Sequence, residues 1–219
     1  MIMTSSPFIS GVVFSGGEPT LQKEALLALA RFAKKQHLAV GIQTNGQFPA
    51  TLEALIAESL ADRIAIDYKT RWEGFSSMPG DHAPVPRDNY QKNIKKSIAI
   101  CKKALREQVI REFEIVITVF YENEEYIKEI AAQIGTIPLV LQQGEHKIGN
   151  LQVTASDISH GEYISMRRSL QELHPPLTLA EIKKIADELG RTVRIRTREA
   201  GEITYESDWR CRDARKRQR

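Results

Sequence analysis

Short apolar runs alternate along this chain with longer segments whose apolar residues recur at helical spacing. The runs predict five strands, near residues 11–15, 38–43, 63–67, 113–119 and 138–142. A helix with Thr20 as its N-cap is expected after the first strand, on apolar positions Leu21, Ala25, Leu26, Leu29 and Ala33. Further helices are predicted near residues 52–56, 88–106 and 122–133. Repeated strand–helix units imply a parallel sheet covered by helices, so the predicted fold class is α/β.

Two segments interrupt this alternation and are interpreted as loops, residues 70–88 and 143–161. The first contains several Gly and Pro residues, and the second is Gly-rich and irregular. The C-terminal region then predicts a short helix closed by Gly190. A strand and a returning strand follow it and predict a β-hairpin. These three elements are expected at residues 179–189, 193–197 and 203–205.

Side-chain alternation within the predicted strands separates a bulky face from a small one. Val40 and Ile42 share one face of their strand, opposite Gly41. The following strand places Ala65 opposite its isoleucines. A filled barrel would carry bulky branched residues inside, so these small residues leave space instead.

Polar residues gather at the carboxyl ends of the same strands, where α/β proteins bind ligands. They are Ser15, Gln43, Thr44, Asn45, Asp67, Lys69 and Thr118. Any single one of them is as readily a polar strand end without a functional role. Their convergence from four strands onto one rim favours a ligand site.

The segment Val12–Gln22, VVFSGGEPTLQ, joins the first predicted strand to the first helix. Gly16 and Gly17 have no Cβ, so a ligand can touch their backbone and positive φ is allowed. The Glu18 carboxylate could hold an ammonium group by charge-assisted hydrogen bonds, and Pro19 suits the first turn of a helix. The alternative is a tight turn with an exposed glutamate. The GxGxxG and Walker patterns are absent.

Composition fits one ordinary domain, or one domain with a small appendage. Apolar residues make up 42% of the 219, which is enough for a core, and no apolar run suggests a membrane span. No secretion signal is recognisable, so we expect a cytoplasmic protein. The last eleven residues carry six Lys or Arg against one Asp, within a formal charge of +3. Such a tail is more often solvated than bound to nucleic acid, because no aromatic residues are interleaved with it.

Four sequence patterns carry a family resemblance. SGGEP precedes a leucine-rich helix, IQTNG ends the next strand, IDYK ends the one after, and LVLQQG lies at residues 139–144. Together these patterns resemble the radical SAM superfamily, and most of all the activating proteins of anaerobic ribonucleotide reductase and pyruvate formate-lyase. The resemblance covers residues 9–145. It implies a partial (β/α)6 barrel that here lacks its first strand and cluster loop.

The resemblance also implies an activity, cofactors and partners. In this family a [4Fe–4S] cluster on a CxxxCxxC loop binds the amino and carboxylate groups of S-adenosylmethionine, and one-electron transfer yields a 5′-deoxyadenosyl radical. The implied partners are a glycyl-radical protein, such as anaerobic ribonucleotide reductase, and an electron donor such as flavodoxin or ferredoxin. Nucleic acid and membranes are not expected as partners.

The resemblance further implies which residues contact S-adenosylmethionine. The Gly-Gly-Glu turn would take the methionine ammonium, and the ends of the next two strands would line the site. The later strands would complete the far wall. In chain order, the implied contact residues are Ser15, Gly16, Gly17, Glu18, Thr44, Asn45, Asp67, Lys69, Thr118 and Gln142.

The sequence departs from the family at the cluster. CxxxCxxC is absent, and Cys101 and Cys211 offer no replacement spacing. No metal ligand or catalytic residue is therefore assigned, and the polypeptide as written is expected to lack a cluster and to be inactive. We interpret it as an N-terminally truncated activating enzyme. Its expected parts are a partial barrel, a helix with a hairpin, and a basic tail, over residues 1–160, 161–208 and 209–219.

Two other interpretations stay open. A radical SAM enzyme acting on a nucleobase or tRNA is suggested by the basic tail and by four nearby arginines, Arg191, Arg194, Arg196 and Arg198. A non-catalytic, cluster-free remnant could instead keep a binding role. Because the cluster would supply two of the strongest contacts to S-adenosylmethionine, this ligand is expected to bind weakly, if at all, to the chain alone.

Overall fold

A computed structural model describes residues 9–68, 87–120, 124–144 and 175–207. The chain forms two compact units. The first contains Met1–Tyr68 and Val85–Val116, and the second contains Lys69–Pro84 and Ile117–Arg219. Strands in the described part follow one another in the sheet in chain order, from β1 to β7.

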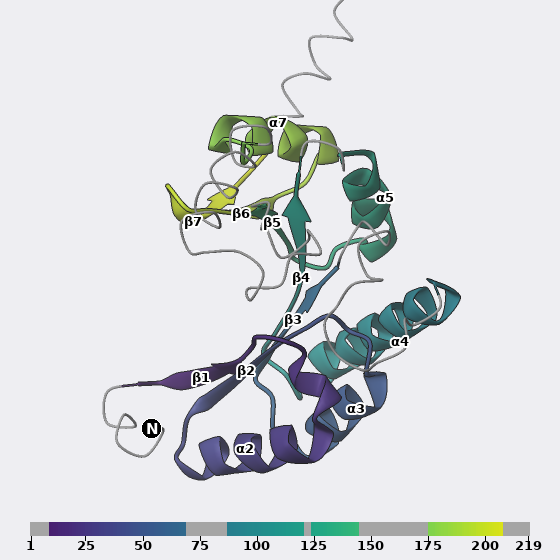
Figure 1. The fold of residues 1–219 in the computed structure, drawn as a ribbon, viewed down its shortest axis with the longest axis vertical. Helices are drawn as coiled ribbons and strands as arrows, with labels where there is room; N and C mark the ends of the chain where they lie inside the picture. Colours follow the sequence, from purple (N-terminus) through teal and green to yellow (C-terminus); the bar gives the residue numbers. More distant parts are fainter. Residues whose placement is uncertain (1–8, 69–86, 121–123, 145–174, 208–219) are drawn as a thin grey trace, which may run out of the picture. The chain divides into compact units, whose positions relative to one another are not determined.

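The first unit is built from parallel strands connected by helices (Figure 1). Its strands are β1 (Gly11–Phe14), β2 (Ala39–Thr44), β3 (Arg63–Asp67) and the first part of β4 (Glu112–Val119). Its helices are the short 3-10 helix η2 (Pro19–Leu21), α2 (Lys23–Lys35), α3 (Pro49–Ala57) and α4 (Arg87–Arg106). Each strand pairs in parallel with the next, which confirms the predicted α/β class for this part of the chain.

Strand register in the first unit places the bulky residues in one row. Phe14 pairs with Ile42, Ile42 with Ile64, and Ile64 with Phe113. Val40 and Ile64 are fully buried. The opposite face carries the row formed by Gln43, Ala65 and Glu114. The predicted division into a bulky face and a small, polar face is therefore confirmed.

The second unit begins with the last residues of β4 and ends in an antiparallel hairpin. Its other elements are α5 (Glu124–Ile134), β5 (Leu139–Gln143), α7 (Leu179–Leu189), β6 (Val193–Thr197) and β7 (Gly201–Tyr205). The Gly144 N–H donates to the Val119 carbonyl over 3.0 Å. Strand β5 pairs in parallel with β6, and β6 pairs antiparallel with β7. The predicted helix closed by Gly190 and the predicted hairpin are both confirmed.

The predicted N-cap of the first helix is wrong. Helix α2 begins at Lys23, and its N-cap is Gln22, which makes no side-chain capping hydrogen bond. Thr20 lies instead within η2, where Pro19 starts a separate short turn. The Glu18 side chain caps that turn by accepting from the Thr20 N–H. Glu18, four residues after the end of β1, therefore caps η2, the short turn that precedes α2.

Several predictions fall wholly or mostly on residues that the structure does not describe. They are the loop at 70–88, the loop at 143–161, the domain boundary at 160 and the basic tail at 209–219. Within the described ranges, no helix is long and apolar enough to cross a membrane.

Candidate functional site

The Gly-Gly turn leaves the end of β1 with an exposed backbone. Ser15, Gly16 and Gly17 are all exposed. Gly16 has φ 86° and Gly17 has φ 55°, a region that disfavours residues with a Cβ. A Cβ built on either glycine would meet nothing within 4 Å. Conformation rather than crowding therefore requires glycine here, and the space in front of this backbone is open.

The Glu18 carboxylate ties this turn to the end of β2. Its Oε1 accepts from the Thr20 N–H at 3.0 Å, from the Thr20 hydroxyl, and from the Thr44 hydroxyl at 2.6 Å. Its Oε2 accepts from the Asn45 N–H at 2.7 Å. Glu18 is therefore half-buried and bonded by the protein, not exposed as the alternative interpretation expected, although it does cap a tight turn. The structure brings together Glu18, Thr44 and Asn45, as predicted.

Thr20 is the residue of this cluster that sequence reasoning missed. The sequence pattern assigns it to the cap of α2, whereas its side chain and N–H both contact Glu18. The order Glu18-Pro19-Thr20 is the sequence feature that could have predicted this contact. Proline at the first position of a turn leaves the preceding residue as N-cap, whose side chain accepts from the N–H two residues on.

The loop after β2 is held in place from both of its sides. The Thr44 hydroxyl accepts from the Gly46 N–H at 3.1 Å, and Asn45 Oδ1 accepts from the Gln47 N–H at 2.9 Å. Helix α4 contributes Ser97, whose hydroxyl donates to the Gly46 carbonyl over 2.7 Å. Gly46 has φ 72°, and a Cβ there would lie 3.2 Å from Ile66. The strand end that carries Thr44 and Asn45 is therefore rigidly positioned.

The other predicted contact residues are distributed over both units. Asp67 ends β3 in the first unit, on the same strand face as Ala65, and is half-buried. Lys69 lies outside the described residues. Thr118 and Gln142 belong to the second unit. Their part in one site with Glu18 stays a prediction.

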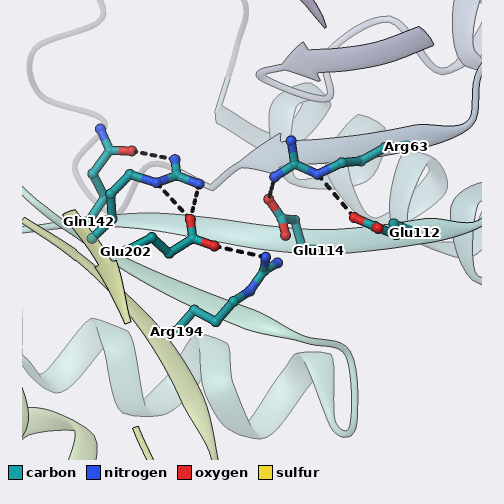
Figure 2. A network of polar contacts seen from close by, with 7 residues as sticks. Arg63, Glu112, Glu114, Gln142, Arg194 and Glu202 are labelled. Carbon is teal, nitrogen blue, oxygen red and sulfur yellow. Dashed lines mark hydrogen bonds and ion pairs between the residues drawn. The ribbon is translucent and has the colours of Figure 1, made fainter. Parts of the chain in front are cut away.

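The polar face of the first unit carries a buried ion pair that the sequence did not reveal. Arg63 Nη2 lies 2.5 Å from Glu114 Oε1, and Arg63 Nε lies 3.4 Å from Glu112 Oε2 (Figure 2). Glu114 is 1% exposed. Because a buried charge is costly unless it is paired, the ion pair with Arg63 helps to make Glu114 tolerable there.

A second ion-pair cluster lies on β5, β6 and β7 within the second unit. Glu202 accepts from Arg194 Nη1 at 3.0 Å (Figure 2). It also accepts from Arg196 Nε at 2.9 Å. Gln142 Oε1 accepts from Arg196 Nη1 at 3.1 Å. Burial alone would raise the pKa of Glu202, but the hydrogen bond from Arg196 and the charges of both arginines outweigh it and lower the pKa. Gln142 is thus engaged by a neighbouring strand.

Arg191 is also engaged by the protein itself. Its guanidinium donates to the carbonyls of Gly135 and Ile137, just after α5. Burial lowers the pKa of this arginine. Three of the four arginines that suggested a nucleic-acid surface, Arg191, Arg194 and Arg196, are therefore committed to contacts within the chain.

The residues that the structure describes do not fit an iron–sulfur cluster. Cys101 is fully buried in α4, and burial raises the pKa of its thiol to about 12. A cysteine binds such a cluster as its thiolate, and this thiol stays protonated at neutral pH. Cys211 lies outside the described residues. Among the residues that the structure does describe, His, Cys, Asp and Glu side chains form no group of three that could hold a metal ion.

Comparison with known proteins shows the family. The family model described as the radical SAM superfamily matches residues 3–134, more than half of the chain. The chain belongs to the radical SAM superfamily. The predicted family is thereby confirmed.

One curated relative carries a more specific description. It is a protein of Methanocaldococcus jannaschii provisionally named glycyl-radical enzyme activating enzyme MJ1227. The two are 36% identical over 141 residues, which cover 64% of this chain and 57% of that protein. The match thus spans little more than half the length of that relative.

A solved structure shows a similar fold. The structure of TYW1 with a lysine-pyruvate adduct bound matches with a TM-score of 0.50 and 16% sequence identity. The match covers 91% of this chain and 57% of that one. At this identity the likeness concerns the fold alone, and it agrees with the predicted partial radical SAM-type barrel.

Proposed function

We propose that this chain binds S-adenosylmethionine at the Gly-Gly-Glu turn, as part of an activating enzyme for a glycyl-radical protein. The observation that carries the proposal is the Glu18 carboxylate, fixed beside exposed glycine backbone by four donors from Thr20, Thr44 and Asn45. Membership of the radical SAM superfamily supports the cofactor. The name of the relative from Methanocaldococcus jannaschii supports the activating role.

The chemistry of S-adenosylmethionine suits this turn. Its methionine part carries an ammonium group, for which a carboxylate is a charge-assisted acceptor. Glu18 would hold that group, and the bare backbone of Gly16 and Gly17 would let the ligand approach closely. The remaining contacts are proposed for the strand ends named from the family, Ser15, Thr44, Asn45, Asp67, Lys69, Thr118 and Gln142.

These residues would supply the S-adenosylmethionine half of a radical SAM site and not the cluster half. The cluster of the family is the source of the electron that cleaves the sulfonium, and Cys101 does not fit the role of its ligand. The 219-residue chain by itself is therefore expected to bind S-adenosylmethionine weakly and to leave it uncleaved. A glycyl-radical protein and an electron donor remain the proposed partners.

Nuclear magnetic resonance tests the binding half of the proposal. The 15N-labelled chain is titrated with S-adenosylmethionine into the millimolar range, and in parallel with 5′-methylthioadenosine, which lacks the amino-acid group. The amide signals of Gly16, Gly17 and Asn45 are expected to move with S-adenosylmethionine and not with the control. If these signals stay still while the ligand is in large excess, the turn is not its binding site.

The native protein tests the activating-enzyme half. Its intact mass, compared with the coding sequence upstream of Met1, shows whether a form with CxxxCxxC exists. Such a form is expected to cleave S-adenosylmethionine under reducing, oxygen-free conditions and to install a radical on its partner. A native chain that starts at Met1 would contradict this half and leave binding as the function.

A further inference from the structure

We propose that Thr20 and Thr44 are positioning residues that hold one oxygen of the Glu18 carboxylate, Oε1, so that the other, Oε2, meets the ammonium group of the ligand. This inference rests on the proposed binding of S-adenosylmethionine at the turn. It assigns a role to Thr20 that sequence reasoning did not foresee. It also changes the role of Thr44, from lining the ligand to orienting the group that binds it.

The donors around Glu18 are unevenly divided between its two oxygens. Oε1 accepts three hydrogen bonds, two from Thr20 and one from Thr44, whereas Oε2 accepts one, from the Asn45 N–H. A carboxylate offers about four lone-pair sites over its two oxygens. Oε1 is therefore saturated, and the acceptor capacity that remains is on Oε2.

The two hydroxyl groups have no freedom to serve a ligand directly. Each hydroxyl carries a single proton, and its partners within the protein are Oε1 and the hydroxyl of the other threonine. The hydroxyl oxygens lie 3.1 Å apart. Thr20 is 1% exposed and Thr44 is 3% exposed, so water is not at hand to replace either one.

Both threonines also make hydrogen bonds to groups other than Glu18. The Thr44 hydroxyl accepts from the Gly46 N–H at 3.1 Å. The Thr20 carbonyl accepts from the hydroxyl of Thr51 in α3 at 2.9 Å. The orientation of the carboxylate is therefore set before any ligand arrives. A preorganised acceptor of this kind improves affinity, because no conformational entropy of the Glu18 side chain is lost on binding.

Valine substitutions remove these hydroxyls while keeping the side-chain shape. In Thr20→Val and Thr44→Val, affinity for S-adenosylmethionine is expected to fall by up to about tenfold each, because binding must then order a carboxylate that is no longer held. Affinity for 5′-methylthioadenosine is expected to stay unchanged, because that ligand has no ammonium group. Thr44→Ser and Thr20→Ser keep the hydroxyl and should restore affinity. Thr204→Val, on exposed strand β7, is the matched control.

Each outcome of these titrations decides a different point. If the unmodified chain binds S-adenosylmethionine and both valine variants bind it equally well, the positioning role is wrong and the proposed function stands. If the valine variants lose both ligands equally, together with thermal stability, the threonines are only structural and the inference is again wrong. If the unmodified chain does not bind S-adenosylmethionine at all, the proposed function fails and the inference fails with it.

Discussion

Asp62 shows how one residue joins several elements of the first unit. Its Oδ2 accepts from Lys34 Nζ at 2.6 Å and from the Val40 N–H at 2.7 Å, and its Oδ1 lies 3.8 Å from Arg111 Nε. Burial works to raise the pKa of this carboxyl, but the hydrogen bonds from Lys34 and Val40 and the nearby positive charges outweigh it and lower the pKa. The Asp62 side chain therefore joins α2, β2 and the residue before β4 most strongly while it is ionised, in addition to the backbone hydrogen bonds of Asp62 with Val40, Arg111 and Glu112.

Replacing Asp62 with asparagine should destabilise the protein in a pH-dependent way. Since its folded-state pKa is lowered, its contribution is present above the unfolded value near 3.9 and is lost as pH falls through the folded value. At pH 7 we expect Asp62→Asn to lower the free energy of unfolding by about 2 kcal/mol. Urea unfolding of both proteins at neutral and acidic pH measures this, and the difference should shrink in acid. A difference that does not change with pH would contradict the role of the charge.

An exposed ion pair provides the control for that experiment. Lys128 and Glu188 lie 2.6 Å apart, with half of each side chain accessible to water. Pairs of this kind contribute little to stability, so Glu188→Gln should change the free energy of unfolding by less than about 0.5 kcal/mol.

The sequence was sufficient to predict the part of the candidate site that consists of polar residues after strands. Glu18, Thr44 and Asn45 each follow an apolar run, and parallel strands bring such positions to one rim. The partnership of Arg63 with Glu114 could not be predicted in this way. That partnership depends on the register between β3 and β4, and these two strands are far apart in the sequence. Local patterns carry no information on register between such strands.

At the scale of elements, helix ends differ in how well the sequence specifies them. Helix α7 begins with a capping box, in which the Thr178 hydroxyl accepts from the Glu181 N–H and Glu181 accepts from the Thr178 N–H. It ends at Gly190 in the left-handed conformation, with φ 61°. Helix α2 has no side-chain cap. This explains why the bounds of α7 were predicted correctly, while the start of α2 was placed too early.

Removing the cap of α7 should weaken the protein measurably. We expect Thr178→Ala to lower the free energy of unfolding by about 1 kcal/mol, because the Glu181 N–H loses its acceptor at an exposed helix end. Thr178→Ser keeps the hydroxyl and should stay close to the original stability. Urea unfolding monitored by circular dichroism distinguishes the two. Equal stabilities for the alanine and serine variants would show that the capping box contributes nothing.

At the scale of the whole molecule, the strand order determines which strands lie at the sheet edges. In the described part of the chain, β1 and β7 each have a single strand neighbour. Strand β7 carries Glu202, a charge that discourages pairing with another molecule. Strand β1 has the sequence Gly-Val-Val-Phe, and its Val13 is 56% exposed although its register partner Gly41 is buried. An apolar strand edge of this kind favours association between copies.

Val13→Lys therefore tests whether β1 drives self-association of the 219-residue chain. We expect the unmodified chain to form oligomers as its concentration rises, and the lysine variant to stay monomeric in size-exclusion chromatography with light scattering. The substitution should cost less than about 0.5 kcal/mol of stability, since the side chain is exposed and a lysine stem can lie over Gly41. Leu29→Lys, at an exposed position of α2, serves as the control for added charge alone. If Leu29→Lys prevents association as well as Val13→Lys does, general charge repulsion rather than the β1 edge is the cause. If the unmodified chain is monomeric at every concentration, this strand edge does not pair.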